Sequence, residues 1–542
     1  MGLSGTQQFN AMNGTTPTTA TWSVNGVQGG NSTFGTIDSS GKYTAPGSFP
    51  SPDNFMVTAT TSSASGNASL TVAFPNDNHL GQTPPIKLGT TGGNTTDSTT
   101  SGKTITCCSG TLGSLINKGG GLFILSNDHV LDKSSFGATG DPIGQPGLVD
   151  NNCNAGTTVA NLTQAAALKP SPCTTTPCTG AAPSNVDAAI AAIVPGMVDP
   201  TGSILDLGPA GANSIAPAPP SSTLAVAANV LAANEGVAKS GRSSGLTCSN
   251  LQSVNTSVSV DYNSSCGGSK AFTSTFSNQV VINGGSFSAG GDSGSLVVTS
   301  DTARPVGLLY AGNNTSTTAN PIQDVITALG PFTIVGGGDH TVSCDPTATA
   351  SSASKTVGAS SAKLSTAETD RVNAVKEKYA ARLFANPAIR DISAGASADN
   401  PQEGALFITV SSGTASLPAV LDGVRTRIAY TGGSTPRASL TAIHAAAAIQ
   451  EAHVQGLMAQ PGIQGVGVGV SDDNPAEPAM VIYVITGEPH APIPPIMDGL
   501  RTKIIEGDRF RAFGWGKETV QPLCSKKPQS NLINNKGARK LR

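Results

Sequence analysis

Residues 290–296 read Gly-Gly-Asp-Ser-Gly-Ser-Leu and lead into a short β-type run that ends at Val298. A serine held between glycines in a tight loop before a strand is typical of a catalytic nucleophile. Because a hydroxyl is a weak nucleophile until a base takes its proton, Ser293 would need a base, an acid that orients the base, and donors for an oxyanion. The loop therefore predicts acyl transfer through an activated serine.

The candidate base is a histidine, because an imidazole changes its charge near neutral pH. His129 follows the apolar run 122–125 and three small polar residues, so it lies where a buried strand ends. We predict that His129 is the base. The other five histidines lie at expected domain edges or in the C-terminal third: His79, His340, His444, His453 and His490.

The orienting acid should lie between the base and the nucleophile along the chain. Asp187 does so and precedes the β-like run 188–193, Ala-Ala-Ile-Ala-Ala-Ile. We predict that Asp187 is this acid. The other acids in this part of the chain are expected to have different roles, Asp128 as a loop carboxylate and Asp132, Asp141 and Asp150 on the solvated surface.

Residues 104–345 resemble trypsin-like serine peptidases of the chymotrypsin fold, in a bacterial subgroup akin to the plant narrow-leaf protease. The resemblance implies a double six-stranded β-barrel and a triad of His129, Asp187 and Ser293. It also implies an oxyanion hole made by the N–H groups of Gly291 and Ser293, with Asp292 bracing the loop. The segments that carry it are 124–131, 186–190, 239–247, 290–296 and 306–312.

The same resemblance places a substrate pocket. Phe287, six residues before the serine, would line its floor, and Tyr310, Ala311 and Gly312 would form its wall. No acid stands at the floor position, and Leu309 stands where a glutamyl-specific enzyme has a histidine. We therefore predict a preference for uncharged substrate residues.

We predict a multidomain, mainly β protein. Residues 1–75 resemble a bacterial Ig-like β-sandwich, shortened at its N-terminus, and the 104–345 peptidase is followed by an α+β domain over 366–516. Polar, Gly-, Thr- and Ser-rich stretches at 76–103 and 346–365 are expected to be linkers. The remaining residues, 517–542, form a basic tail that we expect to be disordered.

The α+β domain contains an internal repeat. Pro387, Asp399-Asn400-Pro401 and Glu403 recur 74 positions later, and Asp422-Gly423 recurs 76 positions later. Each copy is expected to contain a helix, at 370–385 or 441–459, followed by strands that include 405–410 or 480–485. We therefore interpret 366–516 as one domain made of two similar halves.

Composition limits the classes of function. The net charge of -3 and the 12% share of charged residues argue against a nucleic-acid partner, and no apolar stretch is long enough for a transmembrane helix. The cysteines lack zinc-site spacing, so we expect disulfides, with Cys173–Cys178 and Cys248–Cys266 as the pairs, and neither a metal nor a cofactor. We expect secretion or cell-surface exposure, although 1–6 contain no signal peptide, and for this reason we expect a truncated N-terminus.

Three functions remain open. The first is a serine endopeptidase acting on protein or peptide substrates. The second is a catalytically silent, adhesin-like binding protein on a peptidase scaffold. The third is a self-processing peptidase that cleaves its own linkers. The oligomeric state does not follow from the sequence.

Overall fold

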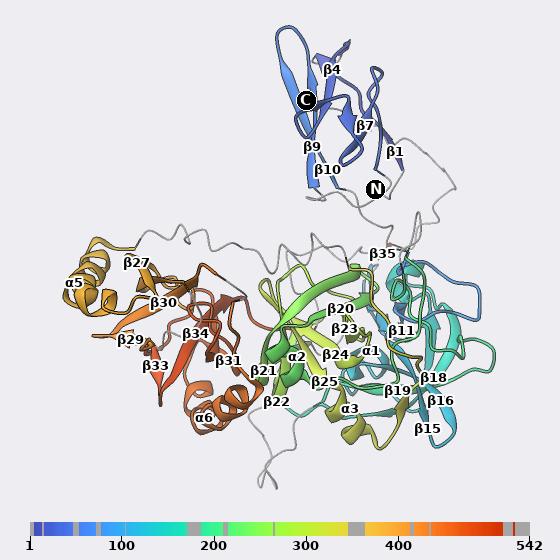
Figure 1. Cartoon of the computed structure of the whole chain (residues 1–542). Helices are drawn as coiled ribbons and strands as arrows, with labels where there is room; N and C mark the ends of the chain where they lie inside the picture. The colour runs from blue at the N-terminus through green and yellow to red at the C-terminus, as the bar shows by residue number, and fades with distance from the viewer. Residues whose placement is uncertain are drawn as a thin grey trace.

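The computed structural model is mainly β (Figure 1). None of the helices in the described parts is long and apolar enough to cross a membrane. The structure describes residues 5–13, 16–46, 54–71, 77–102, 104–170, 186–209, 215–263, 266–344, 364–411, 417–432, 435–512 and 524–525. Most of the predicted 346–365 linker and of the 517–542 tail, and both members of the predicted Cys173–Cys178 pair, lie outside the described residues.

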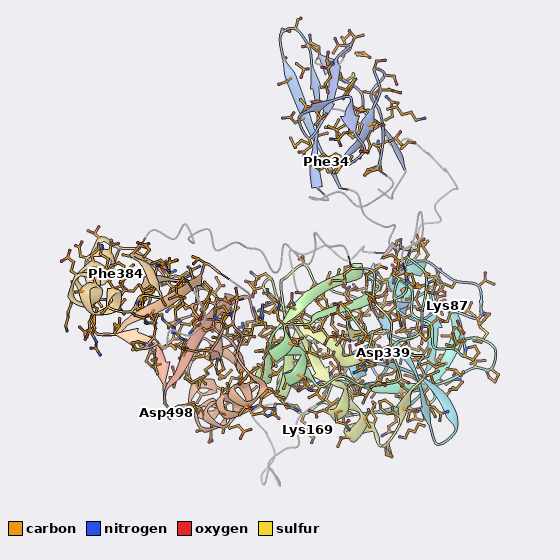
Figure 2. The ribbon with its side chains drawn as sticks, viewed as in Figure 1. Phe34, Lys87, Lys169, Asp339, Phe384 and Asp498 are labelled. Carbon is orange, nitrogen blue, oxygen red and sulfur yellow. A yellow bond between two sulfur atoms is a disulfide. The ribbon has the colours of Figure 1, made fainter. Side chains whose placement is uncertain are left out.

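The N-terminal unit contains two four-stranded sheets, with orders β1-β8-β7-β6 and β10-β9-β4-β5, and the two-stranded sheet β2-β3. The unit has one core around Trp22, Tyr43 and Val57. Figure 1 shows this unit above the rest of the molecule, and Phe34 marks it in Figure 2. Its strands are β1 (Thr6–Gln8), β2 (Met12–Asn13), β3 (Thr16–Pro17), β4 (Thr21–Val24), β5 (Val27–Gln28), β6 (Gly30–Asn31), β7 (Gly35–Ile37), β8 (Lys42–Thr44), β9 (Asn54–Thr60) and β10 (Ser65–Thr71).

An eight-stranded sheet follows, in the order β14-β11-β17-β18-β19-β16-β15-β26. The strands β14 and β15 are separated only by Gly113, whose N–H donates to Leu125 of β16, so the sheet curls back on itself. Its members are β11 (Thr90–Asn94), β14 (Gly110–Leu112), β15 (Ser114–Lys118), β16 (Gly121–Ser126), β17 (Pro142–Gln145), β18 (Thr157–Ala165), β19 (Ala189–Ile193) and β26 (Thr333–Ile334), with the short helices α1 (Asp128–Leu131) and η1 (Leu148–Asn151) between strands.

The expected linker over 76–103 is wrong for most of its length. Strand β11 is entirely buried in the eight-stranded sheet, and β12 (Ser98–Ser101) pairs with β13 (Thr104–Cys107). Their small, polar Thr, Gly and Ser residues resemble a linker in composition, yet the small residues of β11 fit a crowded interior, where a Cβ on Gly92 would lie 2.5 Å from Leu112. Two residues of the predicted tail also form a strand, β35 (Cys524–Ser525), which pairs with β13.

A second ring contains six strands in the order β20-β23-β24-β25-β22-β21, and pairing between β20 and β21 closes it. Apolar residues alternate along these strands and fill the interior. The strands are β20 (Gly236–Gly241), β21 (Gly245–Asn263), β22 (Lys270–Asn283), β23 (Leu296–Thr299), β24 (Pro305–Gly312) and β25 (Ser316–Pro321), flanked by α2 (Ala227–Ala233) and α3 (Ile322–Leu329).

The C-terminal module consists of two segments with the same strand order. Strands β27-β28-β30-β29 and β31-β32-β34-β33 each pair antiparallel, parallel and antiparallel in turn, and a helix capped by Ser365 or Ser439 precedes each set. The first segment contains α5 (Thr366–Phe384), β27 (Ile389–Ala396), β28 (Gly404–Val410), β29 (Val420–Leu421) and β30 (Val424–Tyr430), and the second contains α6 (Leu440–Met458), β31 (Ile463–Val470), β32 (Pro478–Ile485), β33 (Ile496–Met497) and β34 (Leu500–Gly507).

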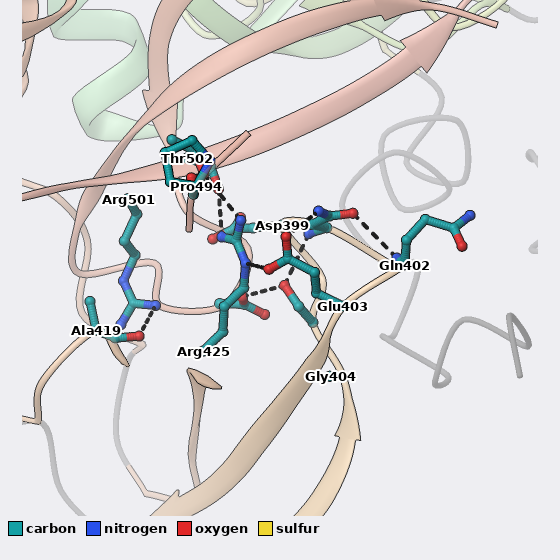
Figure 3. Close-up of polar contacts among 12 residues, drawn as sticks. Asp399, Gln402, Glu403, Gly404, Ala419, Arg425, Pro494, Arg501 and Thr502 are labelled. Carbon is teal, nitrogen blue, oxygen red and sulfur yellow. Dashed lines mark hydrogen bonds and ion pairs between the residues drawn. The ribbon is translucent and has the colours of Figure 1, made fainter. Parts of the chain in front are cut away.

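Arginines connect the two segments reciprocally. Arg425 donates to Glu403 of its own segment and to the carbonyl of Thr502 in the other (Figure 3). Arg501 donates in the same way to Glu477 and to the carbonyl of Thr426. These matching contacts make the two segments a single packed unit.

The module is not a separate domain, contrary to our expectation. Strand β31 pairs antiparallel with β21, so the sheet of the second barrel continues without a break into the second segment of the module. Apolar residues of α6 and β31, among them Ile443 and Val466, share one core with Val237 and Leu251 of the barrel.

Three disulfides lie within the described residues, and they correct one predicted pair. Cys248 bonds to Cys344, and Cys266 bonds to Cys108, so the predicted Cys248–Cys266 bond is wrong. The short spacing along the chain is misleading, because Cys248 lies near the start of the long strand β21 and Cys266 lies in the turn after its end. The third bond joins Cys107 to Cys153.

Candidate active site

His129 lies in the four-residue helix α1, directly after β16, and its side chain is fully buried. Its Nδ1 lies 2.6 Å from Oδ2 of Asp187, and its backbone N–H lies 3.3 Å from the other carboxylate oxygen. The antiparallel pairing of Ser126 with Ala189 brings the end of β16 beside the start of β19, where Asp187 lies. The two side chains therefore meet because neighbouring strands place them there.

Three further side chains hold Asp187 in place. The hydroxyl of Tyr262, on β21, donates to Oδ2 of Asp187 at 2.7 Å. The amides of Asn127 and Asn320 donate to its backbone carbonyl at 2.7 and 3.1 Å. Nothing in the local sequence of Tyr262 or Asn320 indicated these contacts, because both residues come from the second barrel.

Asp128 is not the loop carboxylate that we expected. It is fully buried beside His129, and Ser135 donates to one of its oxygens at 2.9 Å. Burial raises the pKa of Asp128 to about 9, and the neighbouring charges of Asp187 and Asp132 act in the same direction. At neutral pH this carboxyl group is therefore protonated.

Asp150 is not an ordinary solvated acid either. Arg242 donates to both of its carboxylate oxygens, at 2.6 and 2.9 Å, in a bidentate pair. The backbone N–H of Arg242 also donates to Thr111. Because Thr111 in turn donates to the carbonyl of Gly291, this pair supports the serine loop.

Ser293 is 2% exposed and lies against β14 of the eight-stranded sheet. Its carbonyl accepts a hydrogen bond from Thr111 N–H at 2.8 Å. A Cβ on Gly110 would lie 2.5 Å from Val130 and 3.0 Å from the carbonyl oxygen of Ser293. Val130, which follows His129, and the backbone of Ser293 therefore both pack against Gly110. The hydroxyl of Ser293 lies 3.4 Å from the carbonyl oxygen of Tyr310 and 3.3 Å from that of Ala512.

Hydrogen bonds to two carbonyl groups of the serine loop fix the directions of the N–H groups that follow them. Ser243 Oγ donates to the carbonyl of Gly290, and Ser295 donates to the carbonyl of Asp292. In a trans peptide the N–H points opposite to the C=O, so the N–H groups of Gly291 and Ser293 each point away from the bonded carbonyl of the preceding residue. Gly291 has a φ of 103°, a conformation that a residue with a side chain rarely adopts.

A buried lysine braces the loop. Nζ of Lys239 lies 3.3 Å from Asp292, and both side chains are fully buried. Burial raises the pKa of Asp292, but the charge of Lys239 and hydrogen bonds from Ser244, Ala289 and Ser243 outweigh this effect and hold the pKa below its ordinary value. Burial also lowers the pKa of Lys239, against the opposing effect of Asp292. Lys239 lies in the segment 239–247, and nothing in its local sequence indicates this role.

The residues of the predicted pocket have different surroundings. Phe287 is 2% exposed and packs in the core of the second barrel, with Nζ of Lys239 5.9 Å from its ring centroid. Tyr310 and Ala311 are fully buried, and the Tyr310 ring packs on Phe276. Gly312 exchanges two backbone hydrogen bonds with Arg511, from the end of the C-terminal module.

Comparisons with known proteins found similarity only among solved structures. No protein-family model matches the chain, and no curated protein matches it. One similar structure is a glutamic acid specific serine protease that utilizes a novel histidine triad in substrate binding, with 17% identity and a TM-score of 0.30, over 46% of this chain and 100% of that chain. Protease A of Thermobifida fusca and the alpha-lytic protease homolog N4 each have 16% identity and a TM-score of 0.27, over 46% of this chain and 98% of theirs.

Proposed function

We propose that this chain is a serine endopeptidase with Ser293 as nucleophile, His129 as base and Asp187 as orienting acid. The observation that carries the proposal is the buried 2.6 Å contact between Nδ1 of His129 and Asp187. This contact fixes the imidazole so that Nε2 is the nitrogen left for proton transfer.

The chemistry follows from these groups. His129 takes the proton of Ser293 as the serine oxygen attacks a peptide carbonyl, and Asp187 stabilises the imidazolium that forms. The N–H groups of Gly291 and Ser293 would donate to the oxyanion of the tetrahedral intermediate. His129 then returns the proton to the leaving amine, and water hydrolyses the acyl-enzyme by the same steps.

A fluorophosphonate probe tests this proposal, since it reacts only with an activated serine. We expect the full chain to be labelled and Ser293→Ala to remain unlabelled. Ser259→Ala, a change on the half-buried outer side of β21, is the matched control and should be labelled like the parent. Equal labelling of Ser293→Ala and the parent would rule out the endopeptidase and favour the catalytically silent binding protein.

The finer parts of the proposal concern location, modules and specificity. The three disulfides support export to an oxidising compartment. The shared core of the N-terminal sheets supports an Ig-like spacer, and the matching strand orders support an internal repeat over 366–516. The apolar surroundings of Phe287 favour uncharged substrate residues. Strict cleavage after Arg, Lys or Glu in a peptide-library digest would contradict this specificity.

A further inference from the structure

The segment that follows β34 runs back into the candidate active site. Residues 508–512 leave the C-terminal module and reach Ser293, to which Ala512 presents its carbonyl oxygen at 3.3 Å. Phe510 and Ala512 are each 1% exposed. Ala512 is 219 positions from Ser293 in the sequence, yet its segment covers the serine hydroxyl.

Residues 510–512 lie between two edges of the second barrel, and Arg511 forms isolated β-bridges there, antiparallel with Gly312 and parallel with Asp261. On one side, Arg511 donates to and accepts from Gly312, at 3.1 and 3.2 Å. On the other side, Asp261 N–H donates to the carbonyl of Phe510 at 3.0 Å, and Ala512 N–H donates to the carbonyl of Asp261 at 3.2 Å. Four backbone hydrogen bonds thus hold three residues of chain.

Each of the two edges, Gly312 in β24 and Asp261 in β21, lies close in sequence to a residue that contacts the proposed triad. Gly312 lies two residues after Tyr310, whose carbonyl oxygen is 3.4 Å from Ser293 Oγ. Asp261 directly precedes Tyr262, whose hydroxyl donates to Asp187. A peptide that is to be cleaved must lie extended along such edges to bring its carbonyl to the serine, and residues 510–512 already occupy this place.

The C-terminal module anchors the segment. Gln464 of β31 donates to the carbonyl of Asp508 at 2.8 Å and accepts from the N–H of Phe510 at 2.9 Å. The ring of Phe510 packs edge-on against Tyr483 of β32, with the centroids 5.8 Å apart. The module therefore determines where the segment lies.

We propose that residues 508–512 are a built-in competitive inhibitor that fills the peptide-binding groove between Gly312 and Asp261. This inference rests on the proposed endopeptidase function. It also names the substrate class, an extended peptide bound through its backbone, with an apolar side chain where Phe510 lies and a small one where Ala512 lies. Cleavage of another protein then requires the segment to leave the groove.

The test compares rates of fluorophosphonate labelling in the full chain. Arg511→Pro removes the N–H that donates to Gly312, whereas Arg511→Ala keeps it and changes only an exposed side chain. Gln464→Ala removes two anchoring hydrogen bonds without altering the segment. We expect Arg511→Pro and Gln464→Ala to be labelled about fivefold faster than the parent, as the loss of one or two hydrogen bonds implies, and Arg511→Ala to change less than Arg511→Pro. Arg304→Ala, which removes a surface ion pair with Asp339 outside the segment, is the matched control and should be labelled at the rate of the parent.

Addition of the free peptide Asp-Arg-Phe-Arg-Ala (508–512) provides a second readout. It should slow labelling of Arg511→Pro and compete with a chromogenic peptide substrate. Equal rates for the parent, Arg511→Pro and Gln464→Ala, with no effect of the peptide, would overturn the inhibitor and leave the endopeptidase standing. An absence of Ser293-dependent label in every variant would instead overturn the endopeptidase. Circular dichroism confirms that each variant is folded before its rate is compared.

Discussion

At the scale of single residues, the carboxylate of Asp187 combines full burial with a dense set of donors. His129 and Tyr262 both donate to Oδ2, so the negative charge remains satisfied away from water. The two donors differ in the proposed mechanism, in which only His129 moves a proton to and from the substrate.

This difference gives a prediction for substitutions at the acid and at the tyrosine. Asp187→Asn should lower kcat on a peptide substrate by about 10⁴-fold, since the amide holds the imidazole in the wrong tautomer. Tyr262→Phe keeps the acid and should cost only about tenfold, as the loss of one hydrogen bond to a charged group implies. Steady-state kinetics measure both, and equal losses would contradict the roles assigned here.

Asp128 makes the stability of the fold depend on pH. Its native carboxyl group keeps a proton up to about pH 9, whereas an unfolded aspartate loses it near about pH 4. Between these values the native state binds more protons, so the contribution of Asp128 to the free energy of unfolding falls as pH rises.

Replacement of this carboxyl group tests the effect. Asp128→Asn stays neutral, so its melting temperature should fall less than that of the parent between about pH 6 and pH 9. Thermal denaturation at several pH values measures this difference. Parallel curves for the two proteins would show that the carboxyl group of Asp128 binds the same number of protons in the native and the unfolded state.

Lys239 should be essential for the fold of the serine loop. Lys239→Met leaves Asp292 charged and buried without its cation, which we expect to cost about 3–5 kcal/mol of unfolding free energy. The double variant Lys239→Met/Asp292→Asn removes both charges and should regain much of that loss. Urea denaturation of the two variants checks this expectation, and equal destabilisation in both would contradict it.

The sequence indicated residues whose roles depend on local context and missed those that depend on distant partners. Ser293, His129 and Asp187 each stand beside a recognisable strand or glycine loop. Lys239 and Ala512 act through residues 53 and 219 positions away, and only the folded chain brings such groups together. The pairing of Cys248 with Cys344 was missed for the same reason.

At the scale of elements, the two segments of the C-terminal module exchange equivalent contacts. Oδ2 of Asp473 accepts from Ser397 at 2.6 Å, and Oδ2 of Asp399 accepts from Ser471 at 2.5 Å. Burial raises the pKa of Asp399, and the nearby charge of Asp473 adds to this effect. The repeated Asp-Asn-Pro motif thus lies at the junction of the two segments.

The reciprocal arginines give a prediction of equivalence. Arg425→Ala and Arg501→Ala should each lower the free energy of unfolding by about 2–3 kcal/mol, because each removes charge-assisted hydrogen bonds to a buried carbonyl and a carboxylate. Similar losses in chemical denaturation would support a two-fold relation between the segments. A large loss in only one variant would contradict it.

Strand patterns predicted most of the elements of this module. The expected helices at 370–385 and 441–459 correspond to α5 and α6, although α5 begins earlier, where the side chain of Ser365 accepts from Glu368 N–H. Hydrophobic alternation cannot show which sheet edge a strand joins, and therefore the pairing of β31 with β21 could not be predicted.

At the scale of the whole molecule, the packing does not follow the domain boundary that sequence composition predicted. In the barrels Lys87 pairs with Asp199 and Arg304 with Asp339, and in the module His453 contacts Asp498. Figure 2 labels Lys87, Asp339 and Asp498. The core that Leu251 shares with Ile443 crosses the boundary that sequence composition placed near 346–365. The molecule is therefore organised by continuous packing between barrel and module.

The junction of β21 and β31 also predicts how fragments behave in solution. A fragment that ends at residue 344 would present the backbone donors and acceptors of β21 that now pair with β31. Such an exposed edge is a template for pairing between chains, so we expect this fragment to aggregate at concentrations where the full chain stays monodisperse. Light scattering of the two proteins measures this, and a monodisperse fragment would contradict it.

The pairing of β31 with β21 affects the solubility of the protein as well as its proposed activity. If residues 508–512 inhibit Ser293, removal of the whole module would relieve the inhibition but also expose the edge of β21, which can pair with another chain. Loss of β31 would then remove active protein from solution as quickly as it formed. Activation that leaves β31 paired, by releasing only residues 508–512, avoids that outcome.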